Sequence, residues 1–267
     1  MSKLEQSEDR WVTRMGAWFP GDRVVFRGQD LHADLGNATW MDVYLYGILG
    51  RRFNESELKL INAMWVMTSF PDPRLWNNRV AALAGTVRST GTLSIAAAIA
   101  VSEATLYGGQ PVIRALDFFQ RAKKEVEAGG NLNNFAITEL RQLRSIGGFG
   151  RPIVREDERI AYLLEKASAV GLAKGPHTKL AFEIEEALGK ARYRLKLNFG
   201  GLTAALCADM GFTPREYYIG ATMCFVAGMP PCYIDALDHP EGTFFPLRCD
   251  RVKYEGIPPR RWEDDNI

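Results

Sequence analysis

The chain has 267 residues, of which 46% are hydrophobic and 24% are charged. This length suits one large or two small domains, with a core that needs no disulfide or metal to stabilise it. The net charge is +1, with acids and bases interspersed, which argues against a nucleic-acid-binding or membrane-surface protein.

The cysteines and the apolar segments indicate a reduced, cytoplasmic protein. Cys207, Cys224, Cys232 and Cys249 form no C-x-x-C pair and no Cys/His spacing typical of a metal site. The first ten residues lack the apolar core of a signal peptide, and the most apolar stretch, 95–101, is far too short to cross a bilayer. We therefore expect no metal site and no membrane association.

Two elements are predicted in the first third of the chain. The stretch DRVVFRG (22–28) is rich in β-branched and aromatic residues, which predicts a strand paired in a short ribbon. The stretch DPRLWNNRVAALAG (72–85) has apolar residues at helical spacing. Its first residues place Asp72 as the N-cap and Pro73 at the first helical position.

Three more amphipathic helices are predicted from apolar residues at helical spacing. The first covers 133–147 and is closed by Gly147, a residue type that often follows a helix end. The second covers 157–171. The third covers 177–190, where Gly189 suits the position after the last helical residue.

The helix predicted in TPREYYIGATMCFVAG (213–228) opens with a capping box. Thr213 and Glu216 lie on either side of Pro214, so the side chain of each residue can accept a hydrogen bond from the backbone N–H of the other.

With a single predicted strand, the fold class is all-α. Between the helices we expect glycine-rich loops at 107–109, 147–150 and 200–201.

Five stretches, taken in order, resemble segments of the citrate synthase family, particularly its short members that are similar to citryl-CoA lyase. VVFRGQDLHADLGNATWMDVYLYGILGRRF resembles the family's first segment, ATLYGGQP its LHGGA loop, and GGFGRPIVREDER its GFGHP…DPR loop. LKLNFGGLTAAL resembles its Asn-Val-Asp segment, and GMPPCYIDAL a helix near its end. The resemblance covers nearly the full chain.

The resemblance implies an almost wholly helical fold with a large domain and a smaller inserted one. By analogy, residues 1–107 and 216–267 would form the large domain, and 108–215 the inserted domain that closes over the active site. Members of the family are usually homodimers with sites near the subunit interface. The resemblance thus implies a homodimer, with a heteromer containing an active relative as the alternative.

The resemblance also implies a transferase or lyase reaction that joins or splits an acyl-CoA and an oxo-acid, with coenzyme A entering as the thioester substrate. In the family an aspartate removes the proton beside the thioester, and two histidines stabilise developing oxyanions. Here Tyr107 and Arg151 occupy the histidine positions, and Gly200 occupies the aspartate position. No Asp or Glu lies between Glu186 and Asp209, so a shift of register supplies no base. We therefore do not expect the family mechanism to operate unchanged.

Tyr107 and Arg151 are the candidate catalytic residues of an altered mechanism. A tyrosine hydroxyl donates a hydrogen bond to an enolate-like oxygen, and an arginine polarises a carbonyl or holds a second carboxylate. The candidates for a replacement base are Asp72, Asp235, Cys232 and His239. For Asp235 a helix-surface acid, and for Cys232 a buried structural cysteine, are the simpler interpretations.

Arg159 is the main candidate for binding the small carboxylate, because it matches the arginine of the family's DPR motif. Its guanidinium forms two parallel hydrogen bonds with a carboxylate. A solvated charge beside Asp157 and Glu158 is the alternative. Arg74 and Asn198 are further substrate-binding candidates. Two other residues are candidates for anion contacts, with surface charge as the simpler interpretation: Arg88 and Arg248.

The loop Gly147, Gly148, Phe149 and Gly150 matches the family loop that faces coenzyme A. There, absent side chains let backbone groups approach the nucleotide; a helix C-cap followed by a turn is the alternative. Lys196 ends a basic run that begins at Lys190 and that could meet the coenzyme A phosphates. A solvated helix end is the alternative for that run.

The sequence is compatible with three functions. The first is an enzyme that binds an acyl-CoA and a small carboxylate and forms or cleaves a C–C bond by an altered mechanism. The second is a catalytically inactive sensor of coenzyme A or carboxylates, or a partner subunit. The third is a helical interaction protein in which Trp11, Trp18 and Phe19 mark a partner or dimer face.

Overall fold

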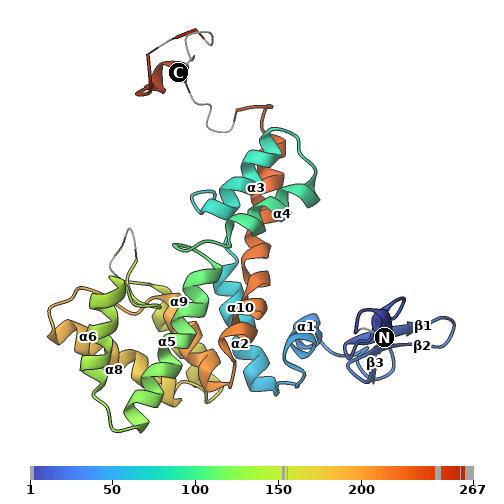
Figure 1. The fold of residues 1–267 in the computed structure, drawn as a ribbon, viewed down its shortest axis with the longest axis horizontal. Coiled ribbons are helices and arrows are strands. Elements are labelled where there is room, and N and C mark those ends of the chain that lie inside the picture. The colour runs from blue at the N-terminus through green and yellow to red at the C-terminus, as the bar shows by residue number, and fades with distance from the viewer. Residues whose placement is uncertain (1–2, 152–153, 155, 244–247, 259, 262–267) are drawn as a thin grey trace.

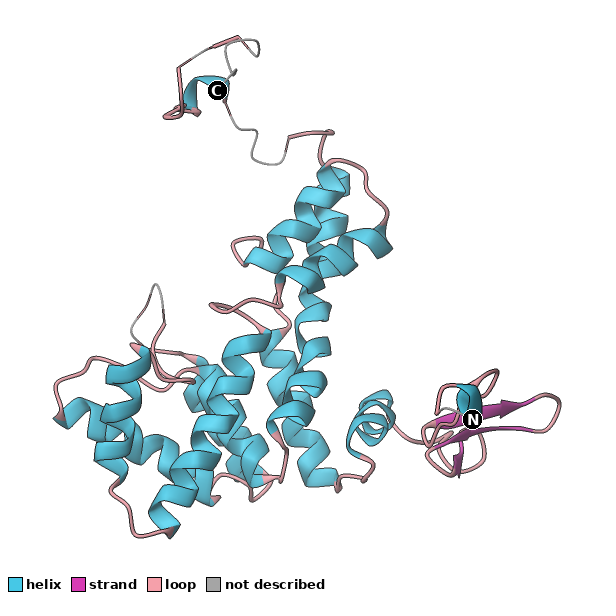
Figure 2. Cartoon of the chain, viewed as in Figure 1, coloured by secondary structure: helices cyan, strands magenta, loops and turns pink. Residues whose placement is uncertain are grey.

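The computed structural model describes residues 3–151, 154, 156–243, 248–258 and 260–261. Helices dominate this part of the chain, which confirms the all-α prediction (Figures 1 and 2). The elements, in chain order, are η1 (Glu5–Ser7), β1 (Gly16–Phe19), β2 (Arg23–Phe26), β3 (Gln29–Asp30), α1 (Trp40–Leu49), α2 (Glu55–Thr68), α3 (Trp76–Thr86), α4 (Gly91–Val101), α5 (Gly109–Glu127), α6 (Leu132–Leu143), α7 (Arg159–Ala169), α8 (Pro176–Lys190), α9 (Phe199–Asp209), α10 (Pro214–Thr222), η2 (Met223–Gly228), α11 (Met229–Asp238) and η3 (Cys249–Arg251).

The strand predicted near the N-terminus is confirmed as β2, the middle strand of an antiparallel sheet. Val24 pairs with Trp18 of β1, and Val25 pairs with Asp30 of β3. The sheet lies beside α1, apart from the other helices (Figure 1). Arg27 Nε donates to the Gly47 carbonyl of α1 at 3.0 Å. Trp11, Trp18 and Phe19 are exposed, as expected.

The main core is built around α5. Leu116, Phe118 and Phe119 are fully buried on this helix, which packs against α6, α8, α9 and α10. A second, smaller core lies where α3, α4 and α11 pack together, at the top of Figure 1. Its buried centre is formed by Ala81, Ala98 and Met229. Small residues let these three helices approach closely, but they bury little apolar surface.

Arg88, a candidate for anion contacts, ties the end of α3 to the end of α11. It has φ +58° and donates to the carbonyls of Leu237 at 2.9 Å and His239 at 2.8 Å. These are orphan carbonyls at a helix C-terminus, which a cation stabilises. Arg88 therefore has a structural role. Arg248 pairs with Asp250 at 2.6 Å in the C-terminal segment.

The start predicted for the helix at 72–85 is wrong. Helix α3 begins at Trp76, and its N-cap is Leu75. Asp72 instead accepts a hydrogen bond from the Arg74 N–H at 2.8 Å, and its carbonyl accepts from the Leu75 N–H at 3.0 Å. An Asp side chain bonded to the backbone two residues on makes a turn, which competes with helix initiation.

The two predictions that place a glycine directly after a helix end are also wrong. Helix α6 ends at Leu143, because Arg144 adopts a left-handed conformation at φ +56°, well before Gly147. Helix α8 continues through Gly189 to Lys190, and the left-handed residue there is Arg192 at φ +65°. In both places an arginine takes the conformation that sequence rules assign to glycine.

The loop expected at 200–201 is helical, because Gly200 and Gly201 belong to the first turn of α9. By contrast, the capping box of α10 is confirmed. Thr213 Oγ1 accepts from the Glu216 N–H at 3.2 Å, and Glu216 Oε2 accepts from the Thr213 N–H at 2.9 Å.

Among the described residues, none of the helices combines the length and apolar character that crossing a bilayer requires.

Candidate functional site

A cavity of about 670 Å³ lies where α2, α5, α9 and α10 meet residues 106–108 and, from the segment before α7 and its first residue, residues 150, 151, 154, 157 and 159. Its polar wall contains most of the side chains that the sequence singled out. They are Arg74, Tyr107, Arg151, Arg159 and Asn198, joined by Asp157. The tertiary structure therefore brings together residues that are up to 124 positions apart in the chain (198 − 74 = 124).

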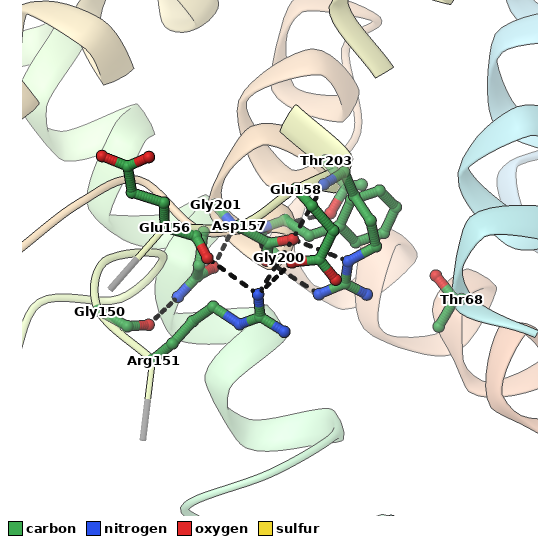
Figure 3. Close-up of polar contacts among 12 residues, drawn as sticks. Thr68, Gly150, Arg151, Glu156, Asp157, Glu158, Gly200, Gly201 and Thr203 are labelled. Atoms are coloured by element: carbon green, nitrogen blue, oxygen red, sulfur yellow. Dashed lines mark hydrogen bonds and ion pairs between the residues drawn. The ribbon is translucent and has the colours of Figure 1, made fainter. Parts of the chain in front are cut away.

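The Asp157 carboxylate is the centre of this polar wall (Figure 3). Its side chain is 1% exposed, and it accepts from Arg159 Nε and Nη2, both at 2.9 Å. It also accepts from the backbone N–H of Phe199 at 2.9 Å, and Arg151 Nη1 lies 3.6 Å away. Burial raises the pKa of Asp157, but the hydrogen bonds from Arg159 and Phe199 outweigh it and hold the pKa below its usual value.

Arg159 is held in place from two sides. Asp157 binds the edge of its guanidinium, and the Phe199 ring lies under it at 4.3 Å from the guanidinium carbon. The side chain is 24% exposed, so it is not a solvated charge. Among the described residues, its side chain donates through Nε and Nη2, which leaves Nη1 as the edge available to a ligand.

Arg151 reaches the same place from the loop that follows Gly150. Its Nη1 donates to Glu158 Oε2 at 2.7 Å and to the Glu156 carbonyl at 3.1 Å (Figure 3). The side chain is 25% exposed. Residues 152, 153 and 155 of the loop lie outside the described residues. Arg151 and Arg159 therefore lie close together on this wall, where Asp157 and the exposed Glu158 balance their two charges.

Asn198 connects the glycine-rich loop to α9. Its Oδ1 caps the helix by accepting from the Gly201 N–H at 2.9 Å, and its Nδ2 donates to the Gly150 carbonyl at 2.8 Å. Its backbone N–H donates to the Gly148 carbonyl at 2.9 Å. Because the amide of Asn198 is used on both sides, its position in the cavity wall is rigid.

Tyr107 lies between aromatic side chains, with ring centroids 5.6 Å from Trp76 and 6.0 Å from Phe225. Burial raises its pKa to about 12, while Arg159 and a hydrogen bond with Asn77 act in the opposite direction. The phenol is therefore protonated at neutral pH. It is a neutral hydrogen-bond donor, which is the form that stabilises an oxyanion.

The remaining substrate and cofactor candidates are less well placed. Arg74 lines the cavity, but its guanidinium is bound in two places by Asp72 and is 87% exposed. Lys196 pairs with Glu185 at 3.0 Å, and its side chain does not line the cavity. Only its backbone carbonyl is near the glycine-rich loop, where it accepts from the Gly150 N–H at 2.7 Å.

The glycine-rich loop packs against two helices. A Cβ on Gly147 would lie 2.7 Å from the Ala115 nitrogen of α5, and one on Gly148 would lie 2.6 Å from the Gly201 Cα of α9. Phe149 is buried against Phe118 and Phe119 of the core. Of the four loop residues, Gly150 lines the cavity. Packing thus accounts for the other three, and their contact with coenzyme A stays a prediction.

Gly200, at the position predicted to lack a base, forms part of the cavity wall. A Cβ there would meet only Asn198 Oδ1, at 3.4 Å, so the space in front of it is open. Sequence reasoning missed Asp157, whose carboxylate reaches the first turn of α9 beside Gly200 (Figure 3). The available signal was the Asp-x-Arg spacing with Arg159, but nothing local shows that Asp157 contacts a helix 42 residues further on.

The other candidate bases lie outside the cavity or are already paired. Asp235 and His239 are exposed and do not line it. Cys232 is buried among α3 and α11, where burial raises its pKa, as expected for a structural cysteine. Asp72 pairs with Arg74. Among the described residues, no group of three or more His, Cys, Asp or Glu side chains could hold a metal ion.

Neither a protein-family model nor a curated protein matches this sequence. Several solved structures, however, match the structure of this chain. Citryl-CoA lyase from Hydrogenobacter thermophilus superposes with a TM-score of 0.81 at 22% identity, and the match covers 94% of this chain and 96% of that one. The fold predicted from the five motifs is therefore correct.

Two larger proteins share the fold. ATP citrate lyase from Methanothrix soehngenii, solved with citrate and coenzyme A, has a TM-score of 0.77 at 17% identity; the match covers 96% of this chain and 44% of that one. Citrate synthase from Thermotoga maritima has a TM-score of 0.64 at 16% identity, covering 83% of this chain and 59% of that one. This chain thus spans less than half of the ATP citrate lyase chain.

Proposed function

We propose that this chain, which has the fold of citryl-CoA lyase, binds an acyl-CoA thioester and a small carboxylate and forms or cleaves the C–C bond between them by an altered mechanism. The observation that carries the proposal is the convergence of Arg151, Arg159 and Tyr107 on one cavity. The fold supports it, because citrate and coenzyme A are bound by a solved protein of the same fold.

The two arginines provide the site for the carboxylate. Asp157 balances the charge of Arg159, and the exposed Glu158 pairs with Arg151 at 2.7 Å. An incoming carboxylate replaces Glu158 as the partner of Arg151, and its donors are the Nη1 edge of Arg159 and the remaining nitrogens of Arg151. Charge-assisted hydrogen bonds of this kind are about twice as strong as neutral ones.

Tyr107 provides the donor for the thioester oxygen. When a C–C bond beside a thioester forms or breaks, negative charge develops on that oxygen, and a neutral donor in a dry site stabilises it. The phenol is protonated and packed between aromatic rings, which restrict the movement of its side chain. When the C–C bond is cleaved, the hydroxyl of the joined compound loses its proton as it becomes the carbonyl of the oxo-acid, and the enolate carbon of the thioester takes up a proton from solvent. No carbon-bound proton is removed, so the splitting direction places the smaller demand on a strong base.

Substitution of Arg159 tests the carboxylate site. Arg159→Ala should weaken binding of a dicarboxylate about 10- to 100-fold, the range for a hydrogen bond to a charged group, and leave free coenzyme A within about twofold. Arg159→Lys should recover part of the loss. Calorimetric titration of both ligands measures this, with Arg248→Ala as the control for removing an arginine outside the cavity. Equal losses for both ligands would show that Arg159 does not select the carboxylate.

Substitution of Tyr107 tests catalysis. Tyr107→Phe should slow exchange of the acyl α-hydrogens into deuterated water about 10²- to 10³-fold, the cost of one oxyanion donor, with unchanged affinity for the acyl-CoA. Proton NMR of the bound and released thioester follows the exchange. Exchange that is equally fast in the variant would remove Tyr107 from the mechanism.

A catalytically inactive binding protein is the second candidate, and one observation favours it. Asp157 is held ionised by Arg159 and Phe199, so it is a weak base, and Gly200 has no side chain. This candidate expects tight binding and no exchange in the native chain. Gly200→Asp, for which the cavity has room, would then create exchange. Exchange by the native chain would exclude this candidate.

A further inference from the structure

The cavity continues from its polar wall into a second half that carries no charge. Arg74, Arg151, Asp157 and Arg159 are the charged residues among the described lining of the cavity, and all of them belong to the polar wall. The second half is formed by α1, α2, α9, α10, η2 and the connection between α9 and α10. Its walls are the buried side chains of Leu45, Ile61, Met64, Phe212 and Cys224.

The polar groups in this apolar half are already bonded to the protein. The Thr203 hydroxyl and the Tyr217 hydroxyl lie 2.7 Å apart and bond to each other. The Thr68 hydroxyl donates to the Met64 carbonyl at 2.8 Å. Burial raises the pKa of the Cys224 thiol to about 12, so this thiol is neutral. The surface presented to the cavity is therefore apolar, and such cavities stay dry and accept apolar ligands.

Helix α9 connects the two halves. Gly200, Thr203 and Cys207 line the cavity, and their spacing of three and four residues places them on one face of the helix. Gly200 lies beside Asp157 at the polar wall, whereas Cys207 contacts Met64 in the apolar half. At 1.5 Å per residue, this face extends about 10 Å from one half to the other. Thr68 of α2 also lines the cavity, and Figure 3 shows it to one side of the cluster around Arg151 and Asp157.

We infer that the apolar half of the cavity holds the hydrocarbon chain of a medium-length acyl group, while the polar wall holds the charged and reacting end of the same ligand. An acetyl group would leave this half empty, whereas a chain of several methylenes would occupy the space along the face of α9 between Gly200 and Cys207. That the chain is the acyl group of a thioester rests on the proposed function. The apolar site itself rests on the cavity.

Gly220 offers a way to close the apolar half without touching the polar wall. It is buried on α10 and lines the cavity, and a Cβ there would lie 3.7 Å from Leu45 Cδ2 and 4.0 Å from Phe212. These are ordinary contacts, so Gly220→Ala fits, and Gly220→Val projects its methyl groups into the space. Gly189→Val is the matched control, because Gly189 is an exposed helical position with nothing near its Cβ.

The test is calorimetric titration of free coenzyme A, acetyl-CoA, butanoyl-CoA and hexanoyl-CoA, with sodium hexanoate as a ligand without the nucleotide. We expect the native chain to bind the esters about fourfold more tightly for each methylene added, the gain for a buried methylene. In Gly220→Val this gain should disappear while acetyl-CoA binds as before. Gly220→Ala should show a smaller loss, and Gly189→Val none. Thermal melting checks that each variant is folded.

The outcomes separate the inference from the proposed function. Equal affinities for all esters, or a gain with chain length that survives in Gly220→Val, would overturn the inference and leave the proposed function standing. Binding of hexanoate that is lost in Gly220→Val, without binding of any coenzyme A compound, would support the apolar site and overturn the proposed function. Failure of all these ligands to bind would overturn both.

Discussion

Asp157 shows how one buried side chain organises several parts of the molecule. Its carboxylate joins Arg159, Arg151 and the first backbone N–H of α9, so it fixes the two arginines and the end of a helix together. A negative charge at a helix N-terminus is favourable, and here it is also hydrogen-bonded. The cost of burying the charge is therefore offset locally.

Asp157→Asn should destabilise the protein by about 3 kcal/mol at pH 7, since it leaves buried charges without their partner. Urea denaturation measures this, with Asp250→Asn as a control at an exposed ion pair. The pH dependence gives a second measurement. The pKa of Asp157 is lower in the folded than in the unfolded chain, so its stabilisation is complete above pH 4 to 5 and is lost as the pH falls through the folded-state pKa.

The native chain should therefore lose stability on acidification more steeply than Asp157→Asn does. The two unfolding free energies, plotted against pH, should approach each other below pH 4. Parallel curves would show that Asp157 contributes the same free energy whether or not it is ionised, which would contradict the ion-paired geometry.

At the level of single elements, the loop 147–150 and helix α9 depend on each other. Asn198 donates to the loop and caps the helix, and Gly148 packs its Cα face against Gly201. Gly148 has φ +86°, a conformation that L side chains rarely adopt. The glycines at this contact are therefore required by a close approach of two backbones.

Gly148→Ala should destabilise the protein by more than about 2 kcal/mol, because it adds both backbone strain and a Cβ that would lie 2.6 Å from the Gly201 Cα. Gly189→Ala, at an open helical position, should stabilise by about 0.5–1 kcal/mol. Denaturation midpoints compare the two. A neutral Gly148→Ala would mean that the loop and α9 are not in contact in solution.

The capping box of α10 makes a smaller and separate contribution. Thr213→Ala removes the acceptor for the Glu216 N–H and should cost about 1 kcal/mol. Thr213→Ser keeps the hydroxyl and should retain most of the stability. Both are measured by urea denaturation, and an equal loss in the two variants would assign the effect to the threonine methyl group instead of the cap.

For the molecule as a whole, the two cores differ in what they bury. Phe118, Phe119 and Leu116 lie in the main core, whereas the core of α3, α4 and α11 is centred on Ala81, Ala98 and Met229. Stabilisation by burial is roughly proportional to apolar area, so the smaller core contributes less. The cavity lies between the helices of both regions, since Trp76 of α3 lines it together with residues of α5 and α9.

Hydrogen exchange should reveal this difference. Backbone amides of α3, α4 and α11 should exchange through an opening of lower free energy than those of α5, α8 and α9, because a smaller core opens first. Exchange measured by mass spectrometry at increasing urea concentrations separates the two groups of helices. A single common opening free energy for all of them would show that the cores unfold as one unit.

The sequence determined features that depend on neighbouring residues. The apolar spacing of 177–190 predicted a helix, and the Thr213–Glu216 box predicted a helix start. The order of five motifs predicted the fold that this chain shares with citryl-CoA lyase. Each of these signals is contained in a few adjacent residues, where the backbone geometry of a helix relates one side chain to the next.

Local rules were less reliable at helix ends and for roles that depend on distant partners. The turn at Asp72 displaced the start of α3, and Arg144 ended α6 where a glycine was expected. Asp157 contacts the backbone of Phe199 42 residues away, and Arg88 bonds to carbonyls about 150 residues away. The free energy of a buried charge or a helix end is set by the groups that surround it in space, so these assignments needed the folded molecule.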